Sequence, residues 1–269
     1  GYKKVAENTN CTLKERRELK TIEKGLSFNG SFWTSKYPWK IDPRKLPNNK
    51  KVALACLAST EKRLNKNPHL AKIYKEQMRE MLDNGVARKL TKQEINSYNR
   101  AVHYISHHAV LKQSSSTPCR IVFNSSARYL GNSLNDFWMK GPDLMNNLLG
   151  VLVRFREKEV AMVGDIRRMY HSVRISEVDQ HVHRFLWRDL QPEKPIEEFV
   201  VTRVSFGDRP AGAIANLALR KTALKSLKDS PDVVKTIIRN SYVDDILDSF
   251  DTASGAKDAA DKIGQIRRK

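Results

Sequence analysis

Cysteine is scarce in this chain of 269 residues, and long apolar runs are absent from it. The three cysteines, Cys11, Cys56 and Cys119, are odd in number and lack the paired spacing of a zinc site, so we expect reduced thiols in an intracellular setting. No apolar run approaches the roughly 20 residues that cross a bilayer. The first residues also lack the apolar core of a secretion signal. We therefore expect a cytoplasmic protein without a membrane partner.

Positive charge is abundant. The chain holds 49 Lys and Arg residues against 30 Asp and Glu, a formal net charge of +19, and most of this excess falls in residues 1–100. An excess of this size indicates a polyanionic partner, most simply nucleic acid. A soluble basic protein with scattered surface lysines is the alternative that charge alone leaves open.

Hydrophobic periodicity predicts an α+β fold with a mainly antiparallel sheet packed on helices. Residues 1–48 are rich in turn signals and predict an irregular lead-in. A helical hairpin follows, in which Asn67 and Pro68 begin the second helix and Asn84 and Gly85 end it. The other expected elements are a β-hairpin over 101–128, a helix over 141–157 opened by Pro142 and Asp143, a buried strand over 159–166, a short helix over 176–183, strands over 184–188 and 197–206, a helix over 211–227 and a strand pair over 240–250.

Two adjacent carboxylates interrupt the last of these strand-like segments. Asp244 and Asp245 follow Tyr242 and Val243, although Asp is depleted from strands. Asp tolerates turn dihedrals and hydrogen-bonds its own backbone, so this window alone favours a tight hairpin turn. The alternative is a turn that holds carboxylates toward a metal ion.

A third carboxylate, Asp165, ends the apolar strand over 160–165. If the two strands are neighbours in one sheet, Asp165, Asp244 and Asp245 converge and form an oxygen-rich site for a hard divalent cation. Such a site suits two-metal phosphoryl transfer, in which one ion activates the attacking hydroxyl and the other stabilises the leaving group. A glycosidase acid/base pair is an alternative, but a net charge of +19 favours a polyanionic substrate.

These residues lie in blocks that resemble a known family. Motifs A and C of reverse transcriptases, Asp-x-x-x-x-Tyr/Phe and Tyr-x-Asp-Asp, are similar to VGDIRRMYHSVRI and YVDDIL in this chain. The order and spacing of further blocks resemble the BEL/Pao class of LTR retrotransposon polymerases from about residue 45 onward. These blocks include ISHHAVLK, RIVFNSSA, GNSLNDFWMKGPDL, RFLWR and FGDRPAGAIANLALRKTA.

The resemblance implies an RNA-directed DNA polymerase with right-hand fingers and palm. Residues 49–160 would be a fingers-like region, and residues 161–269 a palm with motifs A, B and C but no thumb. The expected partners are an RNA or DNA template with primer, deoxynucleoside triphosphates, and the rest of a pol polyprotein with its protease, RNase H and integrase. A cytoplasmic virus-like particle is the expected location. Gly1 in place of Met and the last residues, IGQIRRK, suggest a piece of a longer chain.

The resemblance also implies roles for the metal-site residues. Asp165 and Asp244 would coordinate two Mg²⁺ ions, for which Mn²⁺ is an alternative, with help from the Ile166 carbonyl. Asp245 would support the site. Tyr170 matches the steric gate, a ring that leaves no room for a ribose 2′-hydroxyl, and ordinary aromatic packing is its alternative.

Nucleotide and primer contacts follow from the same resemblance. Lys112 and Arg120 would grip the incoming triphosphate, although Lys112 also fits a solvated hairpin lysine. Phe206 and Gly207 would floor the nucleotide pocket. Tyr242 and Val243 would lie near the primer terminus.

The chain departs from the family pattern in three places. Asn124 stands where related sequences usually have Asp, which bears on support of the fingers hairpin, and Phe206 replaces the Gln of retroviral enzymes. The chain also ends 24 residues after Asp245, before a thumb, RNase H or integrase could fit. A separate cluster, His103, His107, His108 and Cys119, lacks paired zinc spacing, and we interpret these residues as loop and strand positions.

Two rival functions remain. A viral RNA-dependent RNA polymerase would favour Gly-Asp-Asp, and a small or acidic residue in place of Tyr170. A catalytically inactive or domesticated nucleic-acid-binding fragment is the alternative from another class.

Overall fold

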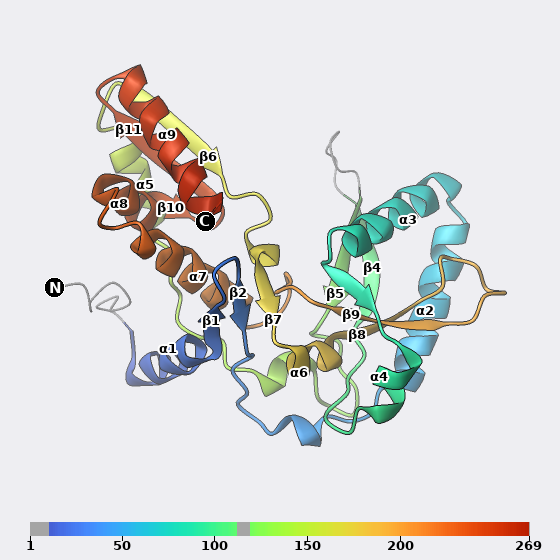
Figure 1. The fold of residues 1–269 in the computed structure, drawn as a ribbon. Coiled ribbons are helices and arrows are strands. Elements are labelled where there is room, and N and C mark those ends of the chain that lie inside the picture. Colours follow the sequence, from blue (N-terminus) through green and yellow to red (C-terminus); the bar gives the residue numbers. More distant parts are fainter. Residues whose placement is uncertain (1–10, 112–118, 269) are drawn as a thin grey trace. The chain divides into compact units, whose positions relative to one another are not determined.

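The chain forms a mixed α/β structure with small antiparallel sheets, seen in a computed structural model that describes residues 11–111 and 119–268 (Figure 1). It divides into two compact units. Unit 1 comprises Gly1–Thr34, Gly141–Val173 and Gly212–Lys269, and unit 2 comprises Ser35–Lys140 and Arg174–Ala211. Each unit is assembled from separate stretches of chain. Within the described ranges, no helix combines the length and apolarity needed to cross a bilayer.

Regular structure replaces much of the irregular lead-in that the sequence predicted over 1–48. Thr12 begins a helix with a capping box, in which its hydroxyl accepts from the Glu15 N–H at 3.2 Å and the Glu15 carboxylate accepts from the Thr12 N–H at 2.8 Å. The buried residues of this helix are Leu19 and Ile22, three positions apart. That narrow apolar face, surrounded by charged residues, explains why the periodicity was missed. The elements here are α1 (Leu13–Gly25), β1 (Leu26–Phe28) and β2 (Trp33–Ser35).

The sheet of unit 1 has the strand order β10-β11-β6, with antiparallel pairing throughout. Residues alternate between its two faces. Met162 and Ile246 are on the buried face and pack against α7, α8 and α9, and Figure 1 shows α9 beside β6 and β11. The bounds are α5 (Leu148–Phe155), β6 (Val160–Asp165), η4 (Tyr170–Ser172), α7 (Ala211–Lys225), α8 (Pro231–Asn240), β10 (Ser241–Tyr242), β11 (Asp245–Phe250) and α9 (Ala253–Arg268).

Three features of this unit differ from the sequence prediction. α5 begins at Leu148, with Asn147 as its N-cap, instead of at Pro142. β6 is half-exposed and not a fully buried strand, since Met162 is its one buried residue. Helices α8 and α9 were not predicted. The Pro231 start and the buried Val233, Val234 and Ile237 of α8 were available signals.

Unit 2 contains the helical hairpin and β-hairpin that the sequence predicted. α2 (Lys50–Asn65) is followed by α3 (Pro68–Asp83), which Asn67 caps by accepting from the Leu70 N–H at 3.0 Å. Gly85 has φ +62°, a left-handed conformation that suits glycine after a helix. The helices contact each other, α2 contacts β4 (Ser106–Leu111), and α3 contacts β5 (Cys119–Asn124).

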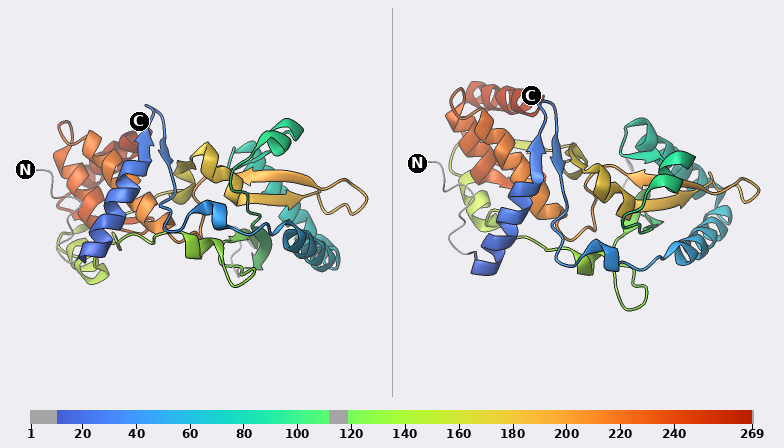
Figure 2. Two further views of the ribbon diagram at one scale, coloured as in Figure 1. Left: turned by 90° about the horizontal axis from the view of Figure 1, so that it is seen from below. Right: turned by 60° about the horizontal axis from the view of Figure 1, so that its bottom comes forward.

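A second antiparallel sheet in unit 2 has the order β3-β9-β8. β8 and β9 pair as an antiparallel hairpin, and both views in Figure 2 show the two strands side by side. The predicted short helix over 176–183 is confirmed as α6 followed by η5. The bounds of these and the remaining elements are η2 (Pro43–Lys45), β3 (Ala87–Lys89), α4 (Lys92–Ser97), η3 (Leu134–Phe137), β7 (Val173–Ile175), α6 (Glu177–Gln180), η5 (His181–His183), β8 (Arg184–Trp187) and β9 (Glu197–Val201).

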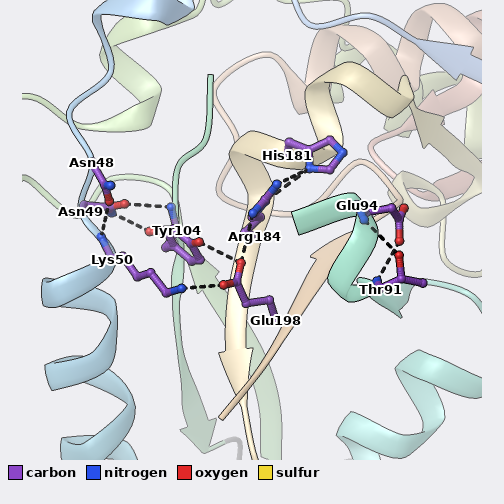
Figure 3. Close-up of polar contacts among 9 residues, drawn as sticks. All are labelled: Asn48, Asn49, Lys50, Thr91, Glu94, Tyr104, His181, Arg184 and Glu198. Carbon is purple, nitrogen blue, oxygen red and sulfur yellow. Dashed lines mark hydrogen bonds and ion pairs between the residues drawn. The ribbon is translucent and has the colours of Figure 1, made fainter. Parts of the chain in front are cut away.

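A buried ion network ties this sheet to the start of α2 (Figure 3). The Glu198 carboxylate accepts from Lys50 Nζ at 2.6 Å, from the Tyr104 hydroxyl at 2.8 Å and from Arg184 Nη1 at 3.1 Å. Arg184 also bonds the His181 ring at 2.8 Å. Burial alone would raise the pKa of Glu198, but the hydrogen bonds from Lys50 and Tyr104 lower it. Glu198 is therefore held as a carboxylate.

Candidate active site

The Tyr242–Asp245 segment is a tight hairpin, as the sequence predicted. Tyr242 and Asp245 are register partners on β10 and β11, so the loop between them is Val243-Asp244. Val243 has φ +55°, a left-handed conformation that is unfavourable for a β-branched residue. Such strain persists where the surrounding structure imposes it, and it is concentrated at functional sites.

Asp165 lies directly across the sheet from Asp245. The neighbouring pair, Ile166 and Asp244, is hydrogen-bonded, because the Ile166 N–H donates to the Asp244 carbonyl at 2.6 Å. Hydrogen-bonded and non-hydrogen-bonded pairs alternate along antiparallel strands. Asp165 and Asp245 are therefore a non-hydrogen-bonded pair, whose Cβ atoms lie about 4.5–5.5 Å apart. The structure thus brings three predicted acidic residues to one end of the sheet, from strands 80 positions apart.

One face of the sheet is covered by the helical core, and the carboxylates are on the other face, which is open at their end. α5 covers this second face at the far end of β11, where the buried Ser249 donates to the Arg154 carbonyl at 2.7 Å. Met162 and Ile246 point into the helical core, whereas Asp165 and Asp245 are exposed. Asp244, in the turn, is half-exposed. Like charges on neighbouring strands repel each other, and exposure to water reduces that cost. The pair can therefore face a ligand without first being uncovered.

Ile166 and Tyr170 connect this end of the sheet to the core. Ile166 is buried, and Tyr170 packs against the same apolar cluster. Burial raises the pKa of the Tyr170 hydroxyl, and the negative charge of Asp244 raises it further. A Cβ on Gly212, at the start of α7, would lie 4.0 Å from that hydroxyl. Tyr170 thus fills core space and also places its hydroxyl near Asp244.

The donors suit a hard cation. Carboxylate and carbonyl oxygens are the ligands that Mg²⁺ takes in proteins. Asp165, Asp244 and Asp245 supply carboxylates at one end of the sheet, whereas the Ile166 carbonyl accepts from the Met169 N–H at 3.1 Å. Among residues 11–111 and 119–268, no three His, Cys, Asp or Glu side chains are already arranged to hold a metal ion. The metal assignment therefore depends on the strand register and not on a preformed cluster.

Of the predicted nucleotide-contact residues that the structure describes, Arg120, Phe206 and Gly207 lie in unit 2, and Tyr170 lies in unit 1. Arg120 is exposed on β5, opposite Val110 of β4. Phe206 and Gly207 are the central residues of a turn in which the Asp208 N–H donates to the Ser205 carbonyl at 3.3 Å. Gly207 has φ +96°, which this position of a type II turn requires. Lys112 falls outside the described residues.

The turn at Phe206 is fixed from both sides. Asn135 donates to the Gly207 carbonyl at 2.8 Å and accepts from the Arg209 N–H at 2.8 Å. A Cβ on Gly207 would lie 3.3 Å from the Phe123 carbonyl, so β5 passes close to the turn. Phe206 itself remains 56% exposed. Phe206 is thus an exposed aromatic residue on a turn whose backbone Asn135 holds in place.

Asp208 is a residue that sequence reasoning missed. It is buried and accepts from the Tyr37 hydroxyl at 2.5 Å, from Ser125 Oγ at 2.6 Å and from the His183 ring at 3.2 Å. Burial alone would lower the pKa of His183, but the Asp208 carboxylate raises it. The network joins segments up to 171 positions apart. No local pattern could have found it, because its partners meet only in the folded chain.

Asn124 and the histidines have structural partners. The Asn124 side chain accepts from the Ser126 N–H at 3.1 Å, which turns the chain at the end of β5. His107 on β4 bonds the Tyr74 hydroxyl at 2.6 Å and the Leu186 carbonyl at 2.9 Å. His103 lies in a loop, whereas His108 and Cys119 lie on β4 and β5. Their predicted loop and strand positions are confirmed.

Comparison of the chain with models of known protein families gives no match, and comparison with curated proteins gives none either.

Proposed function

We propose that this chain is the polymerase region of a reverse transcriptase from a BEL/Pao-class LTR retrotransposon. The observation that carries the proposal is the register of β6 and β11, which sets Asp165 opposite Asp245 on an open face, with Asp244 in the adjoining turn. In this proposal the sheet of unit 1 is the palm, and the hairpins of unit 2 are the fingers. The sequence blocks around these residues support the same assignment.

The reaction is nucleotidyl transfer. The primer 3′-oxygen attacks the α-phosphorus of a deoxynucleoside triphosphate, and pyrophosphate leaves. Two Mg²⁺ ions, when bound, would activate the hydroxyl and neutralise the leaving group. Asp165 and Asp244 would hold these ions with the Ile166 carbonyl, and Asp245 would orient the site. Tyr242 and Val243 lie in the same hairpin and would contact the primer terminus.

Unit 2 provides the nucleotide contacts. Arg120, with Lys112, grips the triphosphate through charge-assisted hydrogen bonds. Phe206 and Gly207 form the floor of the nucleotide pocket, on the turn that Asn135 and Asp208 fix. The template-primer, the remaining pol domains and a cytoplasmic virus-like particle complete the proposed setting.

Primer extension tests the proposal. A longer chain from the same gene should incorporate deoxynucleotides opposite an RNA template in the presence of Mg²⁺, and the matched Asp244→Asn chain should not. Binding of template without incorporation, in Mg²⁺ and in Mn²⁺ alike, would instead identify an inactive nucleic-acid-binding fragment. The Asp244→Asn chain shows whether the activity comes from this protein or from a contaminating polymerase. The substitution removes one carboxylate and changes the side-chain volume little.

Tyr170 provides a prediction on sugar selection. Replacing it with Ala should increase ribonucleotide incorporation relative to deoxyribonucleotide incorporation by about tenfold or more, because a steric clash that excludes the 2′-hydroxyl is removed. Single-nucleotide incorporation by the wild type and by Tyr170→Ala measures the ratio. Tyr170→Phe is the matched control, since it retains the ring, and it should preserve discrimination. If Tyr170 only packs the core, Ala will lower stability and leave the ratio unchanged.

A further inference from the structure

A concave site lies wholly within unit 2, apart from the carboxylates of unit 1. It is a pocket of about 650 Å³. Residues 39–48 form one wall, residues 98–102 form another, and α6 and η5 contribute Val178 and Val182. Ligand pockets in proteins span about 300–1,000 Å³, so the volume suits a small molecule or one to two nucleotides.

The aromatic residues of the pocket are held in place by their polar atoms. Trp39 Nε1 donates to Asp179 at 2.8 Å, which fixes the indole while leaving it only partly buried. The Tyr98 hydroxyl donates to the Val178 carbonyl at 3.1 Å and ties the second wall to α6. The Tyr98 ring stacks on His181 at a centroid distance of 3.6 Å. A ligand thus meets aromatic and aliphatic surface that is already ordered.

Of the charged residues that line the pocket and that the structure describes, Arg100 at the rim is the one that can meet a ligand. Asp42 is engaged by Arg44 at 2.5 Å. Asp179 is buried, and its carboxylate accepts from Trp39, from the Tyr37 N–H at 2.9 Å and from Ser176 at 2.6 Å. Within the described part of the chain, Arg100 is exposed and has no acidic partner. A ligand with an anionic group is therefore favoured.

The remaining polar lining is amide. Asn48 and Asn99 are exposed at the rim, and Asn48 uses its carbonyl oxygen to accept from the Lys50 N–H at 3.1 Å, which leaves its amide nitrogen as a donor (Figure 3). Amides read base edges and phosphates through hydrogen bonds. Aromatic surface, an unpaired guanidinium and amides are the combination found where proteins bind single-stranded nucleic acid.

We propose that this pocket binds a nucleotide unit of single-stranded nucleic acid, with the base against Trp39 and the phosphate at Arg100. The proposal rests on the nucleic-acid substrate proposed above, but the site is separate from the carboxylates and needs no catalysis. An apolar peptide segment is the competing occupant. The unpaired Arg100, the amides and the net charge of +19 favour a polyanion over it.

The indole N–H resonances of the 15N-labelled 269-residue chain provide the test. Trp39 lines this pocket, whereas Trp187 lines a second one of about 370 Å³ with Lys75 and Arg79. Titration with an eight-nucleotide oligouridylate should shift the Trp39 signal in a saturable manner and leave Trp187 in place. Arg100→Ala should weaken the Trp39 titration about threefold to tenfold, as expected for a partly exposed contact to phosphate.

Arg79→Ala is the matched control, because it removes the same charge from the other pocket and should change the Trp39 titration less than about twofold. Equal weakening by both substitutions, an unmoved Trp39 signal, or an equal shift with an apolar peptide would each overturn the proposal. The Asp244→Asn chain should titrate normally. A chain that binds at Trp39 but shows no primer extension would support this site and refute the proposed polymerase. A chain that extends primers without a shift of the Trp39 signal would support the polymerase and refute this site.

Discussion

Asp165→Asn is expected to lower the rate of primer extension by at least about a thousandfold, which corresponds to about 4 kcal/mol of transition-state stabilisation. The reason is the position of Asp165 opposite Asp245, where the loss of one carboxylate removes a negative charge and, in the proposed polymerase, a metal ligand. Exposure of the side chain means that Asn needs no repacking. Single-turnover extension in Mg²⁺ measures the rate, and a thermal unfolding midpoint within about 2 °C of the wild type would show that the fold is retained.

Asp248→Asn is the matched control for this substitution. Asp248 is on β11, the strand that pairs with β6, but it is on the opposite face of the sheet from Asp165, and its carboxylate accepts from the Thr236 hydroxyl at 2.5 Å. Asn can accept the same hydrogen bond through its amide oxygen. Extension by Asp248→Asn should therefore stay within about threefold of the wild type. A similar loss of extension rate in both variants would mean that substitution anywhere in this sheet impairs the chain. The open face would then have no special role in catalysis.

Glu198→Ala is expected to destabilise unit 2 by about 3–5 kcal/mol, because it leaves the buried Arg184 without its carboxylate. The side chains of Arg184 and Glu198 are 3% and 8% exposed, so water cannot replace the lost partner. Tyr104 loses its acceptor in the same step. Urea unfolding followed by tryptophan fluorescence measures the change, since Trp39, Trp138 and Trp187 are in this unit.

The neighbouring glutamate provides the control. Glu197 forms an ion pair with Lys89, but both side chains are substantially exposed, so Glu197→Ala should cost at most about 1 kcal/mol. Glu198→Gln should fall between the two, because the amide oxygen can still accept from Tyr104. A loss for Glu198→Ala no greater than for Glu197→Ala would show that the network contributes little to stability.

Local patterns predicted the elements whose cues are short-range. The Asn67 cap, the apolar spacing around Tyr74 and Met78, and the two hairpins all depend on residues near one another in the sequence. The sequence pattern did not predict α1, because its buried apolar face consists only of Leu19 and Ile22 among charged neighbours. α5 begins after Asn147 and not at Pro142. Both positions carry acceptable helix-start signals, and sequence alone does not rank them.

The candidate site was predictable in part for the same reason. The hairpin at Asp244 is a local feature, whereas its pairing with Asp165 was an expectation that needed the fold. The Asp208 network and the Trp39 pocket were not predictable, because each is made by segments that meet only through tertiary packing. Resemblance to a family supplied roles for single residues, but it could not supply partners such as Tyr37.

The interleaving of the two units has a consequence for how the chain is made. Unit 2 is complete once synthesis has passed Ala211, but the central strand of unit 1, β11, emerges only later. Until then β6 is a strand edge without its neighbour, and Met162 lacks the helices that cover it. Contacts of such long sequence separation form slowly. Nascent chains should therefore depend on chaperones over this interval, and expression at lower temperature should raise the soluble yield by limiting aggregation of the unpaired edge.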